Sequence, residues 1–334
     1  MSEQIAVGVV GCGNMGGSLA AGVDASEAGR LVAFCDPVQE NRAGMVEKYG
    51  GRDYAEIEEF LKDEKVEAVV VATPPALHAD YTVAAARAGR HVFTEKPMAL
   101  STQECARMVE TARDAGVALM VGQVLRFYEP FQSIIRWTRE GRFGRPMHAE
   151  IRRLSGGWFR RTGWRQRLET CGGTLFEVGA HELDFMRCIL GDPTQVYGVR
   201  EKMREVEHEI EDVISLLVRF EEGGSGHYAN GTAWGRGRYD MNLCFEEANL
   251  ISESAFDSSQ LMALRAGCKE EEKIALEGFE EGSGVERQMD AWLRALRDGG
   301  PVPIPGEEGM KTVELAEAAY RSAETGEVVP LDRS

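Results

Sequence analysis

The stretch IAVGVVGCGNMGG (residues 5–17) decides the fold. Its first half, Ile5 to Val10, is an apolar run bounded by glycine, which is typical of a strand buried on both faces of a sheet. The pattern G-x-G-x-x-G follows at once, and a helix is predicted from Asn14 to about residue 25. A glycine-rich turn between a buried strand and a helix is one half of the fingerprint of dinucleotide-binding proteins.

The second half of that fingerprint is an acidic residue at the end of the next strand. Asp36 comes 20 residues after Gly16 and closes the apolar run Leu31 to Cys35. Its carboxylate can accept hydrogen bonds from both hydroxyls of the adenosine ribose and would repel a 2′-phosphate. Because Pro37 follows it rather than a basic residue, the sequence favours NAD over NADP.

The glycines of the turn have separate predicted roles. Gly11 allows the tight turn, Gly13 lets the backbone approach the pyrophosphate, and Gly16 lets the helix pack closely on the strand. The pyrophosphate would lie at the helix N-terminus, where Asn14 and Met15 begin the helix and backbone N–H groups point outward. These five residues form the first part of the predicted cofactor site.

The alternation of short apolar runs and helical stretches continues to about residue 121. Further strands are predicted at 31–35, 68–72, 91–94 and 118–121, and further helices at 39–49, 76–88 and 102–115. Strands that alternate with helices indicate a parallel sheet, in which right-handed crossovers bring the carboxyl ends of the strands to one edge. Ligands bind at that edge. We therefore predict an α/β Rossmann domain over residues 1–122.

Beyond residue 122 the pattern changes to neighbouring strands with few helices. The predicted strands are 147–154, 195–200, 213–220, 227–234, 241–246 and 250–254, and the predicted helices are 127–140, 285–297 and 307–322. A run of strands with helices grouped elsewhere favours an α+β domain built on an antiparallel or mixed sheet. Residues 123–334 are predicted to form this second domain.

Composition argues against several classes of partner. The 334 residues hold 38 Lys+Arg and 55 Asp+Glu, a net charge of −17, which disfavours nucleic acid and anionic lipid. No apolar stretch approaches the roughly 20 residues that span a bilayer, and we expect no signal peptide at Met1 to Gln4. The seven cysteines include no C-x-x-C pair and are expected to be reduced. We expect a cytoplasmic protein with no membrane or nucleic-acid partner.

A lysine is the first candidate for catalysis. Glu95, Lys96 and Pro97 follow the strand at 91–94, on the edge where the nicotinamide end of a dinucleotide should lie. A lysine beside a positive nicotinamide could exchange a proton near neutral pH. A lysine at a strand end is otherwise an ordinary solvated residue, so position alone leaves both interpretations open.

The second candidate is a polar stripe in the second domain. A helix that starts at Thr174 would place Glu177, His181 and Asp184 at i, i+4 and i+7, on one face. Glu177 could then hold the tautomer of His181, whose other nitrogen would take a proton from substrate. A structural histidine on an apolar helix is the alternative. No H-E-x-x-H motif is present, and no metal site is predicted.

These motifs together resemble the glucose–fructose oxidoreductase / inositol dehydrogenase / MocA (Gfo/Idh/MocA) family over essentially the whole chain. The matching elements are the fingerprint from Gly11 to Asp36, ATPPALH at 72–78, Glu95-Lys96-Pro97, Arg126-Phe127, Trp164-Arg165, the stretch from Gly172 to Asp184, and SAETGE at 322–327. The resemblance implies a Rossmann domain followed by an α+β domain with a large open, mostly antiparallel sheet. Members form homodimers or homotetramers through that sheet, and an uncovered sheet favours self-association.

The resemblance also implies an activity and roles for single residues. Members interconvert a secondary hydroxyl and a ketone on a sugar, sugar acid or cyclitol with NAD(P). Lys96 matches the catalytic lysine, His181 the acid/base, and Glu177 the position where the family usually has Asp. The predicted cofactor site gains Thr73, Pro74, His78, Glu95 and Lys96, and the predicted substrate site comprises Lys96, Arg126, Trp164, Arg165, Glu177 and His181. The longer side chain of Glu177 either still orients His181 or reaches the substrate.

An arginine-rich segment leaves the substrate class open. Residues 152–167 hold six arginines and no acidic residue, interleaved with Trp158, Phe159 and Trp164. One hypothesis is a pocket for an anionic sugar, held by an arginine fork on its carboxylate or phosphate. The other, which we favour, is that these arginines form ion pairs with the acidic surface or a subunit contact.

Two other functions fit the same motifs. One is a redox-assisted lyase or glycosidase that retains NAD, oxidises a sugar transiently and eliminates at a neighbouring carbon. It would show no net release of NADH. The other is a non-catalytic NAD-binding regulator, which would be expected to have lost the lysine or the histidine, whereas Lys96 and His181 are both present.

Overall fold

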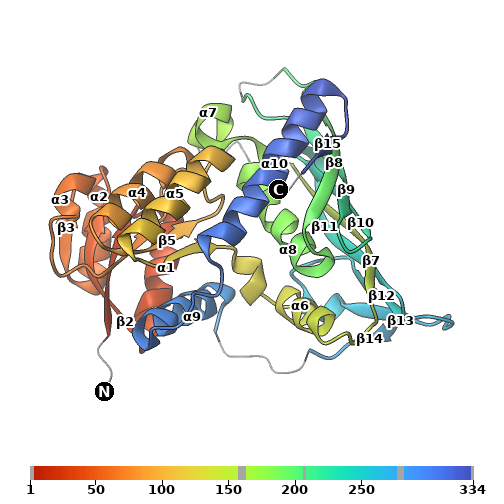
Figure 1. The fold of residues 1–334 in the computed structure, drawn as a ribbon, viewed down its shortest axis with the longest axis horizontal. Coiled ribbons are helices and arrows are strands. Elements are labelled where there is room, and N and C mark those ends of the chain that lie inside the picture. Colours follow the sequence, from red (N-terminus) through yellow and green to blue (C-terminus); the bar gives the residue numbers. More distant parts are fainter. Residues whose placement is uncertain (1–3, 157–162, 206–207, 277–281, 332–334) are drawn as a thin grey trace. The chain divides into compact units, whose positions relative to one another are not determined.

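The computed structural model describes the chain in four ranges, residues 4–156, 163–205, 208–276 and 282–331 (Figure 1). It separates into two units. The first comprises Met1–Val124 and Glu280–Val313, and the second comprises Leu125–Phe279 and Glu314–Ser334. The predicted division at residue 122 placed everything that follows in the second domain, whereas the observed first unit also contains Glu280–Val313.

The first unit is built on a six-stranded parallel sheet in the order β3-β2-β1-β4-β5-β6. Its strands are β1 (Ile5–Val10), β2 (Gly29–Cys35), β3 (Arg52–Tyr54), β4 (Ala68–Val71), β5 (His91–Glu95) and β6 (Leu119–Gly122). β4 is buried throughout, as its apolar run predicts. The order reverses between β1 and β4, which is the arrangement of a Rossmann fold and the place where such sheets bind ligands. The predicted fold of this part is confirmed.

Helices flank this sheet between successive strands. They are α1 (Asn14–Ala25), α2 (Gln39–Tyr49), α3 (Ile57–Phe60), η1 (Pro75–Leu77), α4 (His78–Arg87) and α5 (Thr102–Ala115). The side chain of Ser101 caps α5 by accepting a hydrogen bond from the Glu104 N–H, and Gly116 ends it in the left-handed conformation.

A late segment of the chain packs on the first unit because glycines leave room for it. α9 (Gly284–Asp298) lies against α1, where a Cβ at Gly22 would come within 2.8 Å of Met289. Trp292 of α9 is fully buried, with its ring centroid 5.5 Å from that of Phe93. These contacts are long-range in sequence, and the local patterns that predicted the boundary at residue 122 do not report them.

The second unit is built on a nine-stranded sheet in the order β14-β13-β12-β11-β7-β10-β9-β8-β15. Its strands are β7 (Pro146–Gly156), β8 (Pro193–Glu201), β9 (Val213–Phe220), β10 (Ser225–Gly231), β11 (Ala233–Phe245), β12 (Ala248–Ser252), β13 (Met262–Arg265), β14 (Glu272–Lys273) and β15 (Val329–Pro330). β7 and β10 pair in parallel and the other recorded pairs are antiparallel. The large, mostly antiparallel sheet is therefore confirmed. The strand predicted at 227–234 is two strands, β10 and β11.

Helices lie along one face of this sheet, as Figure 1 shows for α8. The helical elements assigned mainly to this unit are η2 (Val124–Phe127), α6 (Phe131–Arg139), η4 (Gly163–Gln166), α7 (Leu168–Cys171), η5 (Leu175–Gly179), α8 (Ala180–Leu190), η6 (Ser258–Gln260) and α10 (Gly306–Thr325), whose first residues belong to the first unit. The described residues contain no helix with the length and apolar character needed to cross a membrane.

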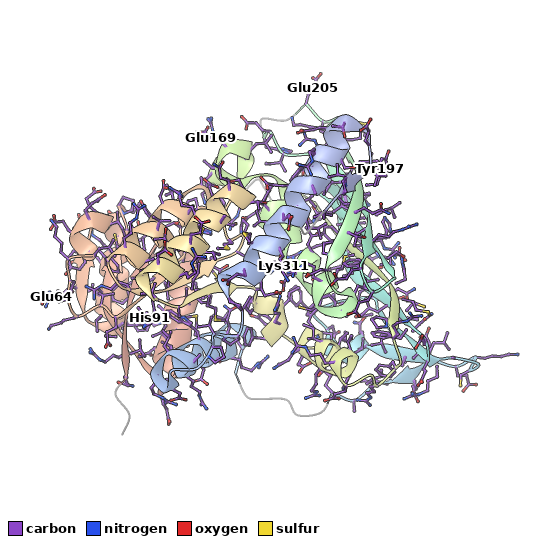
Figure 2. All side chains as sticks on the ribbon, in the orientation of Figure 1. Glu64, His91, Glu169, Tyr197, Glu205 and Lys311 are labelled. Carbon is purple, nitrogen blue, oxygen red and sulfur yellow. The ribbon has the colours of Figure 1, made fainter. Side chains whose placement is uncertain are left out.

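The other face of the sheet carries exposed apolar side chains. Tyr197 and Val199 on β8 are 36% and 46% exposed, and Leu217 on β9 is 58% exposed. Tyr197, labelled in Figure 2, stands directly opposite Leu217 in the antiparallel pairing of the two strands. The three side chains therefore form one apolar patch on the open face.

Candidate functional site

The turn between β1 and α1 separates its glycines into two kinds. Gly11 has a φ of +90°, and a Cβ there would lie 2.6 Å from the carbonyl oxygen of Ala72. A Cβ at Gly16 would collide with the carbonyl oxygen of Gly11. A Cβ at Gly13 would meet no atom of the described residues within 4 Å. The fold therefore requires glycine at positions 11 and 16, whereas Gly13 borders open space.

That open space lies where an anion would bind. Gly13 is the N-cap of α1, and Asn14 and Met15 in the first turn are exposed. The first N–H groups of a helix have no partner within the helix, and the helix dipole places partial positive charge there. An anion such as a pyrophosphate would be favoured at such a helix end, and the site over Gly13 stays a prediction.

Asp36 closes the same region from the end of β2. Its carboxylate is buried and accepts hydrogen bonds from the N–H of Cys12 and the N–H of Val38, both at 2.8 Å, and from Asn41 Nδ2 at 3.3 Å. A carboxylate offers about four lone-pair positions, so one acceptor position is left for a ligand hydroxyl. The Cys12 N–H ties Asp36 to the glycine turn.

The cysteine thiols beside this site are inert. Burial, reinforced by the charge of Asp36, raises the pKa of the Cys12 thiol to about 12. The pKa of the Cys35 thiol is raised to about 12 by the same causes. Both thiols are therefore protonated at neutral pH, and they pack as small apolar side chains.

Arg42 is a residue of this site that our sequence analysis did not single out. It lies on α2, where its Nη1 donates to the carbonyl oxygens of Asp36 and Pro37 at 3.0 and 3.2 Å. Its Nε forms an ion pair with Asp53 at 3.0 Å. A basic residue six positions after Asp36 is the signal that could have found it. Because the guanidinium is engaged by these three groups, it supports the Asp36 loop.

The turns after β4 and β5 are joined by His78. The side chain of His78 is 1% exposed, with Nε2 2.8 Å from the carbonyl oxygen of Thr73 and Nδ1 2.8 Å from that of Pro97. Thr73 Oγ1 is buried and makes no hydrogen bond to any described residue. A buried hydroxyl without a partner is costly, so this atom is suited to a bound ligand.

Lys96 belongs to the second of these turns and is partly exposed. Its backbone N–H donates to Glu95 Oε2 at 3.0 Å, and Glu95 is itself buried. The Lys96–Pro97 peptide bond is cis. The first unit therefore brings together Gly13, Asp36, Thr73 and Lys96 at the carboxyl ends of β1, β2, β4 and β5.

In the second unit, the helix predicted from Thr174 begins there, but its first turn is not α-helical. Leu175–Gly179 form a π-helical turn, and the α-helix starts at Ala180. Thr174 is held by the buried carboxylate of Glu211, which accepts from its N–H at 3.0 Å and from its hydroxyl. Tyr320 donates to the same carboxylate at 2.6 Å. π-Helical turns are rare and frequently occur at functional sites.

Glu177 lies in that π-helical turn and pairs with an arginine. Its side chain is 4% exposed, and its Oε1 accepts a hydrogen bond from Arg165 Nε at 2.6 Å. The guanidinium of Arg165 lies over the ring of Trp164 at 4.3 Å, and Trp164 packs against Cys171 and Val178. The structure thus brings three of the predicted substrate-site residues together: Trp164, Arg165 and Glu177.

Asp184 also pairs with an arginine. Arg126 donates two hydrogen bonds to it, from Nε to Oδ2 at 2.8 Å and from Nη2 to Oδ1 at 2.7 Å. The side chain of Asp184 is 1% exposed, and that of Arg126 is 13% exposed. This bidentate geometry fixes the plane of the Arg126 guanidinium. The stripe predicted from Glu177 to Asp184 therefore includes two acids that each hold an arginine.

The residue that follows His181 anchors its helix on the sheet. Glu182 is fully buried and accepts hydrogen bonds from Arg153 and Tyr239, both at 2.7 Å, and from Tyr228 at 3.0 Å. These contacts join α8 to β7, β10 and β11 and set the rotation of the helix on the sheet. Burial raises the pKa of both tyrosines well above the usual value, so they remain hydrogen-bond donors. The sequence analysis did not single out Glu182.

Family models match nearly the whole chain. A model for an oxidoreductase family with an NAD-binding Rossmann fold matches residues 5–123. A GFO/IDH/MocA C-terminal domain matches residues 131–251, and an oxidoreductase-family C-terminal alpha/beta domain matches residues 251–331. The chain belongs to the Gfo/Idh/MocA oxidoreductase family.

Relatives of this Gfo/Idh/MocA protein have different named activities. The 1,5-anhydro-D-fructose reductase of Ensifer adhaerens is 26% identical over 330 residues, covering 97% of this chain and 98% of that protein. The 2,7-anhydro-N-acetylneuraminate hydratase of Escherichia coli is 31% identical over 192 residues, covering 57% and 50%. A solved structure of the WlbA dehydrogenase from Bordetella pertussis, in complex with NADH and UDP-GlcNAcA, has a TM-score of 0.86 at 24% identity and covers 99% and 100%.

The arginine-rich segment of this family member forms ion pairs within the second unit. Arg152 pairs with Asp240 at 2.6 Å, Arg153 with Glu182 at 2.7 Å, and Arg165 with Glu177 at 2.6 Å. These three arginines form ion pairs, as the favoured interpretation predicts, but their partner carboxylates are buried rather than on the acidic surface. Trp158, Phe159, Arg160 and Arg161 lie outside the described residues.

Proposed function

We propose that this protein is an NAD-dependent dehydrogenase that interconverts a secondary hydroxyl and a ketone on a sugar, sugar acid or cyclitol. The observation that carries the proposal is the open space over Gly13 at the N-terminus of α1, bordered by Asp36 and followed, at the end of β5, by Lys96. A dinucleotide requires the space over Gly13 and the carboxylate of Asp36. Proton transfer at a carbinol requires an ionisable group such as Lys96.

The residues that would hold the cofactor all lie in the first unit. Gly11, Gly13, Asn14, Met15 and Gly16 would cradle its pyrophosphate, and Asp36 would bind its ribose. Thr73, Pro74, His78, Glu95 and Lys96 would border its other end. When bound, NAD supplies the acceptor for a hydride. We propose NAD rather than NADP because the Asp36 carboxylate would repel a 2′-phosphate, and Arg42 is already engaged by Asp53 and two carbonyl oxygens.

The proposed proton chemistry uses two residues. His181, with help from Lys96, removes the proton of the substrate hydroxyl as the carbinol is oxidised, and Lys96 then polarises the developing carbonyl oxygen. In the reverse direction the same groups return the proton. These assignments rest on the match of both residues to the family pattern.

The remaining predicted residues are assigned to substrate binding. Arg126 is held rigid by Asp184 and would donate to substrate oxygens, and the ring of Trp164 would contact a sugar face. Glu177 is proposed to hold Arg165 toward the substrate. This role differs from the two suggested by the sequence, in which Glu177 orients His181 or reaches the substrate itself. An anionic substituent on the sugar would suit the two arginines.

The oligomer is proposed to be a homodimer or homotetramer. The support is the apolar patch of Tyr197, Val199 and Leu217 on the open face of the second sheet. Exposed apolar patches of this kind mark protein–protein contacts, and equivalent patches on two copies can cover each other.

A panel of substrates tests the proposed reaction. The purified protein is mixed with NAD and, separately, with neutral sugars, cyclitols, uronates and sugar phosphates, and the absorbance of reduced nicotinamide is followed. The proposal predicts steady formation of NADH with at least one class. If uronates and phosphates show no kinetic advantage over neutral sugars, the anionic substituent is excluded.

One relative favours an alternative reaction. The Escherichia coli protein with 31% identity is named a hydratase, so we keep the NAD-retaining lyase or glycosidase as a second candidate. Product analysis of the same mixtures separates the two. A lyase consumes sugar without net formation of NADH, whereas a dehydrogenase forms one NADH for each substrate oxidised.

A further inference from the structure

A buried histidine of the first unit has a backbone carbonyl oxygen against each of its ring nitrogens. His78 begins α4 and is 1% exposed. Its Nε2 lies 2.8 Å from the carbonyl oxygen of Thr73, and its Nδ1 lies 2.8 Å from that of Pro97. Both distances are those of hydrogen bonds between nitrogen and oxygen.

These two contacts cannot both be hydrogen bonds if the ring is neutral. A carbonyl oxygen only accepts, so the nitrogen that faces it must carry a hydrogen, and neutral imidazole has one N–H. The other nitrogen would then direct its lone pair at an oxygen lone pair. The imidazolium form donates from both nitrogens, and donors that carry charge make shorter and stronger hydrogen bonds.

The two carbonyl groups belong to turns at the ends of neighbouring strands. Thr73 follows β4 and Pro97 follows β5, and these strands pair in parallel in the sheet. Thr73 is in the turn that also presents a buried hydroxyl without a described partner. Pro97 is bonded directly to Lys96. A single side chain therefore connects the proposed cofactor turn to the lysine that we assign to catalysis.

We infer that His78 is a positioning residue, held as an imidazolium, that ties the turn after β4 to the turn carrying Lys96. The inference rests on the proposed function in one respect, since it treats Lys96 as the residue being positioned. The structural part, a cationic His78 joining two turns, stands without it.

Charged groups on the same elements are compatible with this assignment. Glu95, one residue before Lys96, is buried and supplies negative charge to the same turn, whereas Lys96 supplies positive charge. Asp80, two residues after His78, pairs instead with Arg107 of α5 at 2.7 Å, and both of these side chains are largely exposed. The carbonyl oxygens of Thr73 and Pro97 direct the negative ends of their dipoles at the ring and so favour its cationic form.

Two variants and a matched control test the positioning role. His78→Gln keeps a side-chain donor but cannot reach both carbonyl oxygens as a rigid ring does, and His78→Leu removes every donor at similar volume. His91→Gln is the control, because His91 is a partly buried histidine at the other end of β5, where its Nδ1 accepts a hydrogen bond from the Ala118 N–H at 3.0 Å. This hydrogen bond involves neither turn.

The positioning role predicts a particular pattern of kinetic constants. Displacing a reacting group by about 1 Å can lower kcat on the order of 100-fold, so we expect a loss of that size in His78→Leu and a smaller loss in His78→Gln. The Kd for NAD, measured by calorimetry, should rise several-fold in both variants. His91→Gln should keep the wild-type values of both constants. Wild-type kcat and Kd in both His78 variants would overturn the positioning role.

The charge on His78 is tested on the unaltered protein. Nitrogen-15 NMR of ring-labelled histidine distinguishes imidazolium from either neutral tautomer. Among the six histidines of the chain, we expect a doubly protonated ring at neutral pH and slightly above, with and without NAD, whose signal is lost in His78→Gln. If all six rings are neutral under those conditions, a cationic His78 is excluded, even where the variants fail to fold.

The same design separates this inference from the proposed reaction. If the wild-type protein oxidises no member of the sugar panel, the proposed function fails, but the NMR signal and the effect on the Kd for NAD still decide the role of His78. If the panel succeeds and the ring is neutral, only the role of His78 as a cationic tie fails.

Discussion

Single glycines distinguish what the fold needs from what a ligand needs. The pattern G-x-G-x-x-G predicts three roles but does not show which are intrinsic to the protein. In the structure, side chains at Gly11 and Gly16 would collide with backbone atoms, whereas the space beside Gly13 is open. Gly11 and Gly16 are therefore needed for the turn itself, whereas Gly13 leaves space for a ligand at the N-terminus of α1.

Gly13→Ala should separate stability from cofactor binding. The added methyl meets no atom within 4 Å in the part of the chain that the structure describes, and the residue has a φ of −72°, so the unliganded protein should lose less than about 1 kcal/mol. The same methyl would occupy the space assigned to the pyrophosphate, and the Kd for NAD should rise at least about tenfold, the equivalent of 1.4 kcal/mol. Urea unfolding and calorimetry measure the two quantities. An unchanged Kd would contradict the assignment of this space.

The pair between Arg165 and Glu177 shows what sequence reasoning could not supply at this scale. The motif predicted that Glu177 would serve His181 or the substrate, and it treated Arg165 as a separate contact. The two residues are 12 positions apart, and the π-helical turn that presents Glu177 leaves no local pattern in the sequence. Lys96 and His181, by contrast, were singled out by motif alone.

Arg165→Ala should destabilise the protein by leaving the buried Glu177 carboxylate without its guanidinium. Breaking a buried ion pair costs about 3–5 kcal/mol, but Arg165 is 29% exposed, so we expect about 1–3 kcal/mol. Arg165→Ala combined with Glu177→Gln should recover part of this loss, because a neutral amide costs less to bury. Denaturant unfolding measures each variant.

An exposed pair provides the control for that experiment. Arg113 and Asp114 form an ion pair at 3.3 Å, with side chains 71% and 72% exposed. Arg113→Ala should change stability by no more than about 0.5 kcal/mol. If the two arginine substitutions lower the free energy of unfolding equally, the Arg165–Glu177 pair stabilises the protein no more than an exposed ion pair does.

At the scale of elements, local patterns predicted the strands and helices of the Rossmann sheet well. α5 has the predicted bounds, and β1, β2, β4, β5 and β6 were each expected within a few residues. The strands of two or three residues, β3, β14 and β15, were not predicted, because so short a run has no measurable periodicity. Their pairing depends on neighbours that are distant in the sequence.

The docking of α9 on α1 is an interaction between elements that no local pattern reports. Its condition is a pair of small residues, since a Cβ at Gly22 would lie 2.8 Å from Met289 and one at Gly29 would lie 2.6 Å from Leu293. Because of this contact, the segment 280–313 belongs to the first unit. The sequence motifs had placed it in the second domain.

Gly22→Ala should therefore destabilise the first unit by about 1–3 kcal/mol through overpacking against α9. Gly44→Ala is the matched control, because Gly44 lies in α2 with no atom within 4 Å of a Cβ. There the substitution should stabilise by about 0.5–1 kcal/mol, since alanine favours helix more than glycine does. The melting temperature should fall in Gly22→Ala and rise in Gly44→Ala. A higher melting temperature in both variants would contradict the packing of α9 against Gly22.

At the scale of the whole molecule, the second sheet has one face packed by helices and one face with exposed apolar side chains. The alternation along β8 and β9 produces this asymmetry, because every second residue is buried. The sequence predicted an open sheet only through the family resemblance, since strand pairing and face assignment are long-range properties. The patch of Tyr197, Val199 and Leu217 is where we expect copies of the chain to meet.

Leu217→Asp should weaken that association. A charge placed in an apolar contact must be desolvated without a partner, which costs several kcal/mol. Light scattering of the wild-type protein should give two or four times the 36.8 kDa of one chain, and the variant should shift toward that single-chain mass. Val38→Asp, at an exposed position of the first unit, should leave the mass unchanged. A wild-type protein with the mass of one chain would exclude the oligomer.

The central claim is that Lys96 carries out proton chemistry on a sugar-like substrate while other residues hold NAD. The most direct measurement compares Lys96→Ala with the wild-type protein, using the substrate that the panel identifies. Turnover should fall by about 10²–10⁴-fold, the contribution of a positioned acid or base, while the Kd for NAD stays within a few-fold. Turnover that survives the loss of the lysine would contradict the account.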